Sequence, residues 1–189
     1  EGTALTAAYT YTNDLLTALQ TGSTTYSFTY GDFALRTGVS LGSRNLATYS
    51  YTKDAETGII DKNHYLEKLD YGNDDSVQYS YDKYGRLVAQ TYEDGATVTY
   101  RFDSSGQQSS VYDSASDSTT RYYYDFAGRL CKYSQTSPYA AHSVAYTFDE
   151  LSNITAQKET INGVARTTDY TYDDDNRITS VAVSGNVRN

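Results

Sequence analysis

The sequence predicts an all-β fold, an extended antiparallel sheet of tandem β-hairpins. Three observations predict it: a phrase that returns, side chains that alternate in type, and turn residues at regular intervals. The phrase "YSYDKYGRL" begins at Tyr79, and "YYYDFAGRL" begins at Tyr122. Because self-similarity at a period of about 20–50 residues is the signature of a repeat architecture, we expect one structural unit to be copied along the chain.

Partial copies of the phrase extend the pattern. Three begin at Tyr100, Tyr146 and Tyr170, and degenerate copies begin at Tyr9, Tyr26 and Tyr49. Steps of 21, 22, 24 and 24 residues separate the second aromatic residues, which are Tyr81, Phe102, Tyr124, Phe148 and Tyr172. The step from Tyr51 to Tyr81 is 30 residues, so we expect a longer loop there, in "TKDAETG" (52–58) and "DKNHYLEKLDYGNDD" (61–75).

Each phrase reads as a strand followed by a turn. Tyr79 and Tyr81 are two residues apart, so in a strand they share one face. Asp82 is suited to accept backbone N–H groups at the start of a type I turn. Gly85 then supplies the positive φ that closes a three-residue hairpin loop with a G1 bulge, and Asn176 tolerates the same conformation.

A second turn follows each returning strand, in "YGNDDS" (71–76), "EDGAT" (93–97) and "INGVA" (161–165). Each period is therefore two strands and two turns of an antiparallel meander. Two strands alone are marginal in water, so we expect stability to come from stacking one period on the next. Equivalent tyrosines are expected to form ladders, with each cross-strand aromatic pair contributing ~0.2–1 kcal/mol.

Composition and charge exclude several classes of protein. The chain of 189 residues is 38% hydrophobic and contains 22 tyrosines and five phenylalanines. We therefore expect most of the buried apolar surface to come from aromatic side chains, chiefly tyrosines, which also tolerate contact with water. A net charge of −9 with scattered Lys and Arg makes nucleic acid an unsuitable partner. The sequence contains no run of 18 apolar residues, so it predicts no membrane-spanning helix. The start "EGTALTAA" has no leader, so we expect any signal peptide to be removed or outside this fragment.

Residues that could carry chemistry are few. The single cysteine, Cys131, follows a turn and is expected in a strand as an inert side chain, because no basic cluster adjoins it in sequence. His64 and His142 fall in segments that read as loops or insertions, without metal or triad spacing. Pro138 also marks a loop.

Clusters of acidic residues are interpreted as solvated turn acids. These are Asp74 with Asp75, and Asp173 with Asp174 and Asp175. A glycosidase pair or adventitious calcium is the alternative, but neither cluster matches a DxDxDG loop. We therefore predict no catalytic residue, no cofactor and no metal site, and a protein that is not an enzyme.

The two full phrases resemble the YD repeat, YxYDxxGRL, of the Rhs and YD-repeat family of large bacterial proteins, which is related to the repeat region of animal teneurins. The resemblance covers essentially the whole chain, and its signature falls on Tyr79, Tyr81, Asp82, Gly85, Arg86, Leu87, Tyr100, Phe102, Asp103, Gly106, Tyr122, Tyr124, Asp125, Gly128, Arg129, Leu130, Tyr146, Phe148, Asp149, Tyr170, Tyr172 and Asp173.

The resemblance implies a curved sheet that is part of an Rhs-type spiral β shell, in which family members enclose a C-terminal toxin or effector. It also implies an extracellular or cell-surface location in bacteria. The DPxG segment that closes such shells is absent from this sequence. The chain is therefore expected to be a piece of shell whose partners are neighbouring repeats and an enclosed effector, with self-association through open sheet edges.

The copies depart from the pattern in places. Gln107 and Gln108 replace Arg and Leu, Ser152 and Asn176 replace Gly, and Gly31 stands where Asp is expected. These departures predict looser turns and an irregular N-terminal third. We expect one array over 1–189 without a domain boundary, with degenerate repeats in 1–70 and regular repeats in 71–189.

An alternative is an aromatic ligand-binding module. Hairpin repeats of similar period in cell-wall-binding, choline-binding and toxin receptor-binding proteins use aromatic faces to hold sugars or quaternary ammonium groups. Those sites favour Trp, which this chain lacks, and the YD and GRL pairing is not their signature. Carbohydrate or a surface protein is thus the secondary partner that the sequence leaves open.

Overall fold

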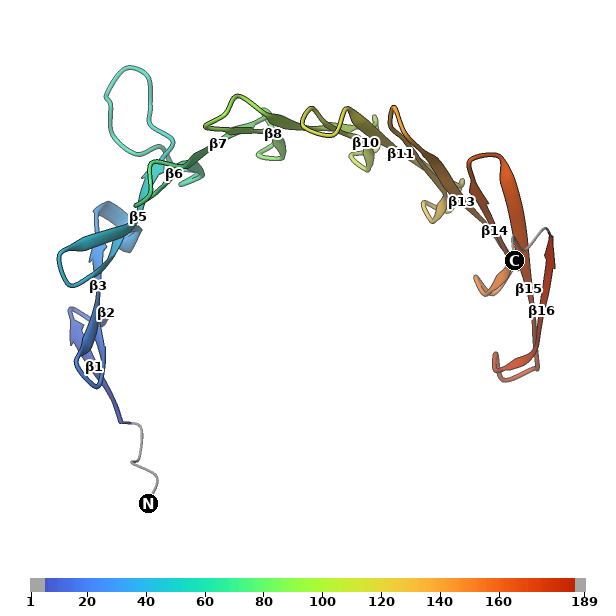
Figure 1. Cartoon of the computed structure of the whole chain (residues 1–189), viewed down its shortest axis with the longest axis horizontal. Coiled ribbons are helices and arrows are strands. Elements are labelled where there is room, and N and C mark those ends of the chain that lie inside the picture. The colour runs from blue at the N-terminus through green and yellow to red at the C-terminus, as the bar shows by residue number, and fades with distance from the viewer. Residues whose placement is uncertain (1–5, 186–189) are drawn as a thin grey trace. The chain divides into compact units, whose positions relative to one another are not determined.

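The computed structural model describes residues 6–185 of the chain. The chain divides into two compact units, Glu1–Ala96 and Thr97–Asn189. Within the described part both units consist of antiparallel strands joined by short turns (Figure 1), which confirms the predicted all-β hairpin fold. The single array predicted over residues 1–189 stays a prediction. The segment "EGTALTAA" (1–8) lies mostly outside the described residues.

Unit 1 is a sheet in which every strand pairs with the next strand in the chain. Its elements are β1 (Ala7–Thr12), β2 (Leu15–Thr21), β3 (Thr24–Tyr30), the 3₁₀ turn η1 (Asp32–Ala34), β4 (Arg36–Leu41), β5 (Arg44–Tyr51), β6 (Leu66–Tyr71), β7 (Ser76–Tyr81) and β8 (Leu87–Tyr92).

Unit 2 follows the same rule of nearest-neighbour pairing. Its strands are β9 (Thr97–Phe102), β10 (Gln108–Asp113), β11 (Ser118–Tyr124), β12 (Leu130–Thr136), β13 (Ala141–Phe148), β14 (Ile154–Ile161), β15 (Val164–Tyr172) and β16 (Ile178–Gly185). Pro138 lies in the connection between β12 and β13, as predicted.

Two kinds of turn alternate along each sheet. One kind is a tight reversal with positive φ, as at Asn162 (48°) and Gly163 (84°) between β14 and β15, a sequence suited to a type I′ turn. The other kind follows the YD phrase and is preceded by a register shift, for example between Ser80 and Tyr81. This shift leaves Val88 unpaired. The predicted G1 bulge lies in the turn itself, where Gly85 has φ of 80° and Asp82 bonds to both Gly85 and Arg86.

The expected insertion is shorter than the sequence suggested. A loop of residues 52–65 leaves the sheet between β5 and β6 (Figure 1) and is closed by one isolated bridge, Lys53 to Ile60. However, Leu66–Tyr71 is strand β6 and not loop, because its residues pair in register with β5, with Leu69 opposite Tyr49.

The prediction of an irregular N-terminal third is wrong for most of its length. Strands β1 to β5 pair in sequence like the later strands. The irregularities are the turn at η1, where Phe33 and Ala34 take positive φ of 57° and 58°, and a register shift between Val39 and Ser40 in the β4–β5 pair. Backbone pairing therefore holds these strands together even where the phrase is degenerate.

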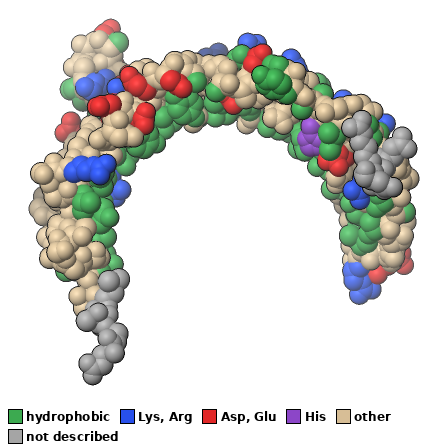
Figure 2. Space-filling model, viewed as in Figure 1, with side chains coloured by type: hydrophobic (Ala, Val, Ile, Leu, Met, Phe, Trp, Pro, Cys, Tyr) green, Lys and Arg blue, Asp and Glu red, His purple; other side chains and the backbone are tan. Residues whose placement is uncertain are grey.

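Few side chains are fully enclosed. Among the described residues the buried hydrophobic positions are Ala47, Val77 and Val144, and Figure 2 shows hydrophobic side chains gathered along one face of the strands. No helix of the described residues is long and apolar enough to cross a membrane. With so little enclosed core, each hairpin depends on hydrogen bonds and face contacts with adjacent strands.

Candidate functional site

The turn after each YD phrase is organised by its aspartate. Asp82 Oδ1 accepts the backbone N–H groups of Tyr84 (2.8 Å) and Arg86 (3.0 Å), and Oδ2 accepts Arg86 Nε (2.7 Å). Gly85 has φ of 80°. The carboxylate therefore fixes the loop by binding donors ahead of it, as the sequence predicted.

The same arrangement recurs in unit 2 despite the departures from the phrase. The backbone N–H four residues after each aspartate donates to it: Gln107 to Asp103, Arg129 to Asp125, Asn153 to Asp149 and Arg177 to Asp173, at 2.8–2.9 Å. Ser152 and Asn176 adopt the glycine conformation, with φ of 70° and 61°. The prediction of looser turns is wrong, because a backbone donor does not depend on the side chain it carries.

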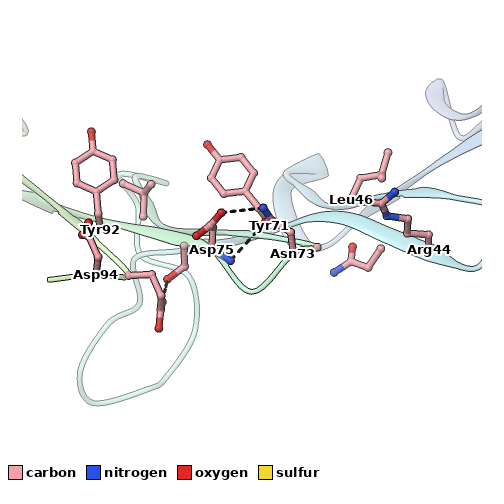
Figure 3. Close-up of a pocket in the computed structure, with 12 residues that line it drawn as sticks. Arg44, Leu46, Tyr71, Asn73, Asp75, Tyr92 and Asp94 are labelled. Carbon is pink, nitrogen blue, oxygen red and sulfur yellow. Dashed lines mark hydrogen bonds between the residues drawn. The ribbon is translucent and has the colours of Figure 1, made fainter. Parts of the chain in front are cut away.

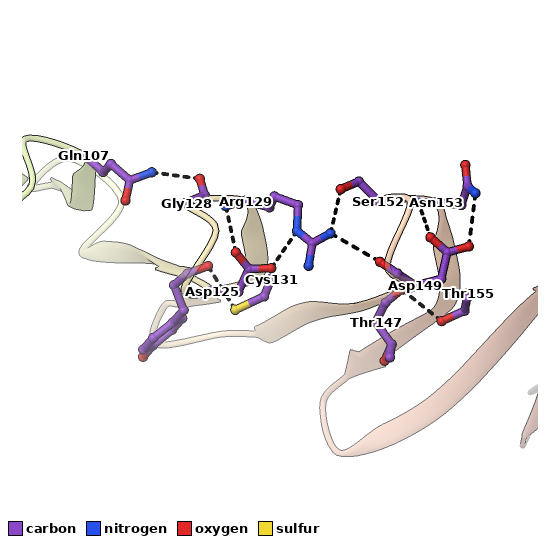
Figure 4. A network of polar contacts seen from close by, with 11 residues as sticks. Gln107, Asp125, Gly128, Arg129, Cys131, Thr147, Asp149, Ser152, Asn153 and Thr155 are labelled. Carbon is purple, nitrogen blue, oxygen red and sulfur yellow. Dashed lines mark hydrogen bonds and ion pairs between the residues drawn. The ribbon is translucent and has the colours of Figure 1, made fainter.

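Successive turns of unit 2 are also joined to one another (Figure 4). The residue that follows the left-handed position reaches the next turn along the sheet. The contacts are Gln107 Nε2 to Gly128 O (2.9 Å), Arg129 Nη1 to Ser152 Oγ (2.8 Å) and Asn153 Nδ2 to Asn176 Oδ1 (2.8 Å). We call this chain of contacts the turn row, and it links four turns into one continuous line.

Arg129 contributes to the turn row in three ways. Its Nε donates to Asp125 Oδ2 at 2.7 Å within its own turn. Its guanidinium lies over the ring of Phe148 at 4.4 Å from the centroid, a distance suited to a cation–π interaction. The same side chain donates to Ser152 in the following repeat. Arg129 thus couples its own repeat to the next.

Tyrosine hydroxyls form a second link between strands. The last aromatic residue of a phrase donates its O–H to a backbone carbonyl at the start of the preceding strand. The pairs are Tyr30 to Leu16, Tyr51 to Arg36, Tyr81 to Leu66, Tyr124 to Gln108 and Tyr172 to Ile154, at 2.8–2.9 Å. These bonds, which we call tyrosine clamps, lie where the bulge interrupts the backbone ladder.

The aromatic face is less regular than expected. Tyr122 lies opposite Tyr133, which in turn lies opposite Val144. Tyr146 lies opposite Gln157. Equivalent tyrosines therefore do not meet directly, since the returning strand of each hairpin stands between them, and the predicted ladder of like residues is wrong in this respect.

Two glycines are required by contacts that could not be seen from the sequence. The ring of Tyr65, in the inserted loop, stacks on Tyr81 at 4.7 Å between centroids, and its hydroxyl occupies the space that a Cβ at Gly85 would need. Gly72 was assigned to chain reversal, but a Cβ there would collide with the carbonyl oxygen of Asn45. Close approach of a distant segment, and not the turn alone, requires glycine at both positions.

The other residues that could carry chemistry lie in strands and in the inserted loop. Cys131 is in β12, as predicted, with Sγ 3.3 Å from the carbonyl oxygen of Tyr123. His142 lies in β13 and not in a loop, because it pairs across the sheet, and its Nε2 is 3.1 Å from Glu159 Oε1. His64 lies in the inserted loop with φ of 55°.

Acidic side chains of both clusters bind partners within their own turns. Asp75 accepts the amide of Asn73 at 2.8 Å, and Asp175 pairs with Arg177 at 2.7 Å. Across residues 6–185 no group of three or more His, Cys, Asp or Glu side chains is placed to hold a metal ion. These contacts agree with the interpretation of the clusters as turn acids.

Hydrogen bonding lowers the pKa values of the turn aspartates. The backbone N–H of Arg129, assisted by its guanidinium, lowers the pKa of Asp125, and the backbone N–H of Arg177 lowers that of Asp173. Partial burial of Asp82 acts in the opposite direction, but bonds from Arg86 and Tyr84 outweigh it, so its pKa is also lowered. The ionised form of each aspartate is thus the one that the turn binds.

Comparison with known proteins agrees with this geometry. Residues 81–117 match the family model described as RHS Repeat, which confirms the predicted family over that segment. Among curated proteins no sequence matches the chain significantly.

Solved structures share the fold. The chain aligns with TcdB2-TccC3 at a TM-score of 0.75 and 17% identity over 92% of its length. It aligns with TcdB2-TccC3-Cdc42 and with TcdB2-TccC3 lacking the hypervariable C-terminal region at a TM-score of 0.75 and 15% identity. The chain spans 10% of the length of each of these chains. The RHS repeat match and this fold support a structural repeat segment.

Removing one tyrosine clamp tests its contribution to stability. Tyr124→Phe keeps the ring but loses the bond to Gln108 O, so we expect the free energy of unfolding in urea to fall by about 1 kcal/mol. The control is Tyr123→Phe, because Tyr123 is 43% exposed, and it is expected to leave stability unchanged. Equal effects of the two substitutions would contradict the role of the clamp.

The lowered aspartate pKa values predict loss of stability in acid. Their unfolded pKa is about 3.9, and the folded pKa is lower, so this stabilisation is present above about pH 4 and is lost as pH falls through the folded pKa. The measurement is the urea midpoint as a function of pH. Asp125→Asn is expected to flatten the profile and Asp174→Asn to leave it unchanged; identical profiles for both variants would refute the account.

Proposed function

We propose that the chain is a non-catalytic wall segment of a large Rhs/YD-repeat protein, part of a β shell that encloses or presents a C-terminal toxin or effector. The observation that carries this proposal is the turn row. Each turn of unit 2 binds the next through a side chain at the same repeat position, so a wall can be lengthened by copying one unit.

Two further observations support a structural role. The fold likeness to TcdB2-TccC3 covers 92% of the chain. In the described residues the signature aspartates and arginines bind groups of their own turns, and the hydroxyls of Tyr81, Tyr124 and Tyr172 bind backbone carbonyls of the chain itself. Side chains used in this way stabilise a wall and are not held ready for a reacting group. Secretion or display at the cell surface is part of the same proposal.

A ligand-binding module is the second candidate. It is favoured by exposed aromatic side chains at Tyr84, Phe126 and Tyr139, of which Phe126 is fully exposed. Rings of this kind can stack on sugars or on protein partners. A titration with glycans tests this role, which requires saturable binding that disappears when exposed tyrosines are replaced by alanine.

Protease protection tests the shell directly. In the full-length parent protein, segments downstream of the repeats are expected to resist a soluble protease while the repeats are folded. A variant that weakens the wall, Asp125→Ala combined with Arg129→Ala, is expected to expose them. Equal digestion of the downstream segments in both proteins, or a parent gene that encodes no downstream segment, would contradict the proposal.

A further inference from the structure

A cleft of about 630 Å³ lies in unit 1 at the ends of strands β6 and β8, within the ~300–1,000 Å³ range typical of ligand pockets. Tyr71 ends β6 and Tyr92 ends β8, so the two rings come from the strands on either side of β7. They are 44% and 39% exposed, which leaves them accessible to a ligand.

Register places both tyrosines on one face. Leu69 lies opposite Val77, and Val77 lies opposite Tyr92. Tyr71 is two residues beyond Leu69 and therefore shares its face, and Figure 3 shows both rings rising from the same side of the strands. Between them the floor is closed by Val77, which shares their face and is only 7% exposed. The cleft thus has aromatic walls and a closed floor.

The polar residues of the cleft are mainly acidic. Asp75, Glu93 and Asp94 line it, against the single basic side chain of Arg44. Asp94 Oδ1 accepts the N–H of Ala96 at 2.9 Å, and Glu93 Oε2 accepts the hydroxyl of Ser76. The cleft therefore combines negative charge with two π faces, and both favour a cation.

We propose that this cleft binds an arginine side chain presented by a partner peptide. A guanidinium group is planar, stacks on aromatic rings and donates in pairs to carboxylates, so it uses the walls and the acids together. A neutral sugar would stack on the walls and donate hydroxyls to the carboxylates, but it would gain no charge–charge attraction from the excess negative charge. This site is independent of the wall function and would exist whether or not the chain encloses cargo.

Calorimetric titration of the whole chain with acetyl-Gly-Arg-Gly-amide tests the proposal. Its neutral counterpart, with citrulline in place of arginine, keeps the shape but loses the charge. We expect saturable binding of the arginine peptide, roughly tenfold weaker binding of the citrulline peptide, and weakening of the first by added salt. Absence of saturable binding, or equal binding of the two peptides, would overturn the proposal.

Variants locate the site. Tyr92→Leu and Asp94→Asn are each expected to weaken the arginine peptide roughly tenfold, and Asn at 94 retains an oxygen for the Ala96 N–H. Tyr112→Leu is the matched control, because Tyr112 is a 37% exposed strand residue outside the cleft. Circular dichroism checks that each variant folds. An unchanged affinity in both cleft variants, or preferential binding of methyl glycosides, would equally reject an arginine site here.

Discussion

The fold depends on hydrogen bonding between each strand and its two neighbours. Almost nothing is enclosed: Val144 is 3% exposed, but no described side chain falls below 2%. The backbone ladder is interrupted by a bulge at every YD phrase, for example beside Tyr81. The tyrosine clamps and the aspartate turns lie at these interruptions, so the recurring residues of the phrase reinforce the points where the ladder is weakest.

This placement explains why the phrase returns in a recognisable form. The carboxylate of each turn binds a backbone N–H, which every residue except proline can supply. Gln107 and Asn153 therefore stand where Arg129 stands in a full copy. The reach to the next turn is also preserved, since Gln, Arg and Asn each provide a side-chain donor. What the repeat requires is a donor at that position and not one particular residue.

Features formed by residues close together in the sequence could be predicted, but contacts between distant segments could not. The turn of Asp82 and Gly85 could be predicted because its partners lie within four residues. The contact of Tyr65 with Gly85 could not, since it depends on how the inserted loop folds back. His142 was misplaced in a loop because the sequence gives no register for β13, and register alone sets it opposite Ile161 of β14.

Stepwise deletion of strands tests most directly whether each hairpin depends on its neighbours. One variant ends after Ile161 and lacks β15 and β16, and a second ends after Thr136 and lacks β13 to β16. If neighbours supply the stability, hydrogen exchange of the amides that remain in β9 to β12 will accelerate at each step. Unchanged protection of those amides, or a stable fold in a peptide containing only β15 and β16, would contradict the account.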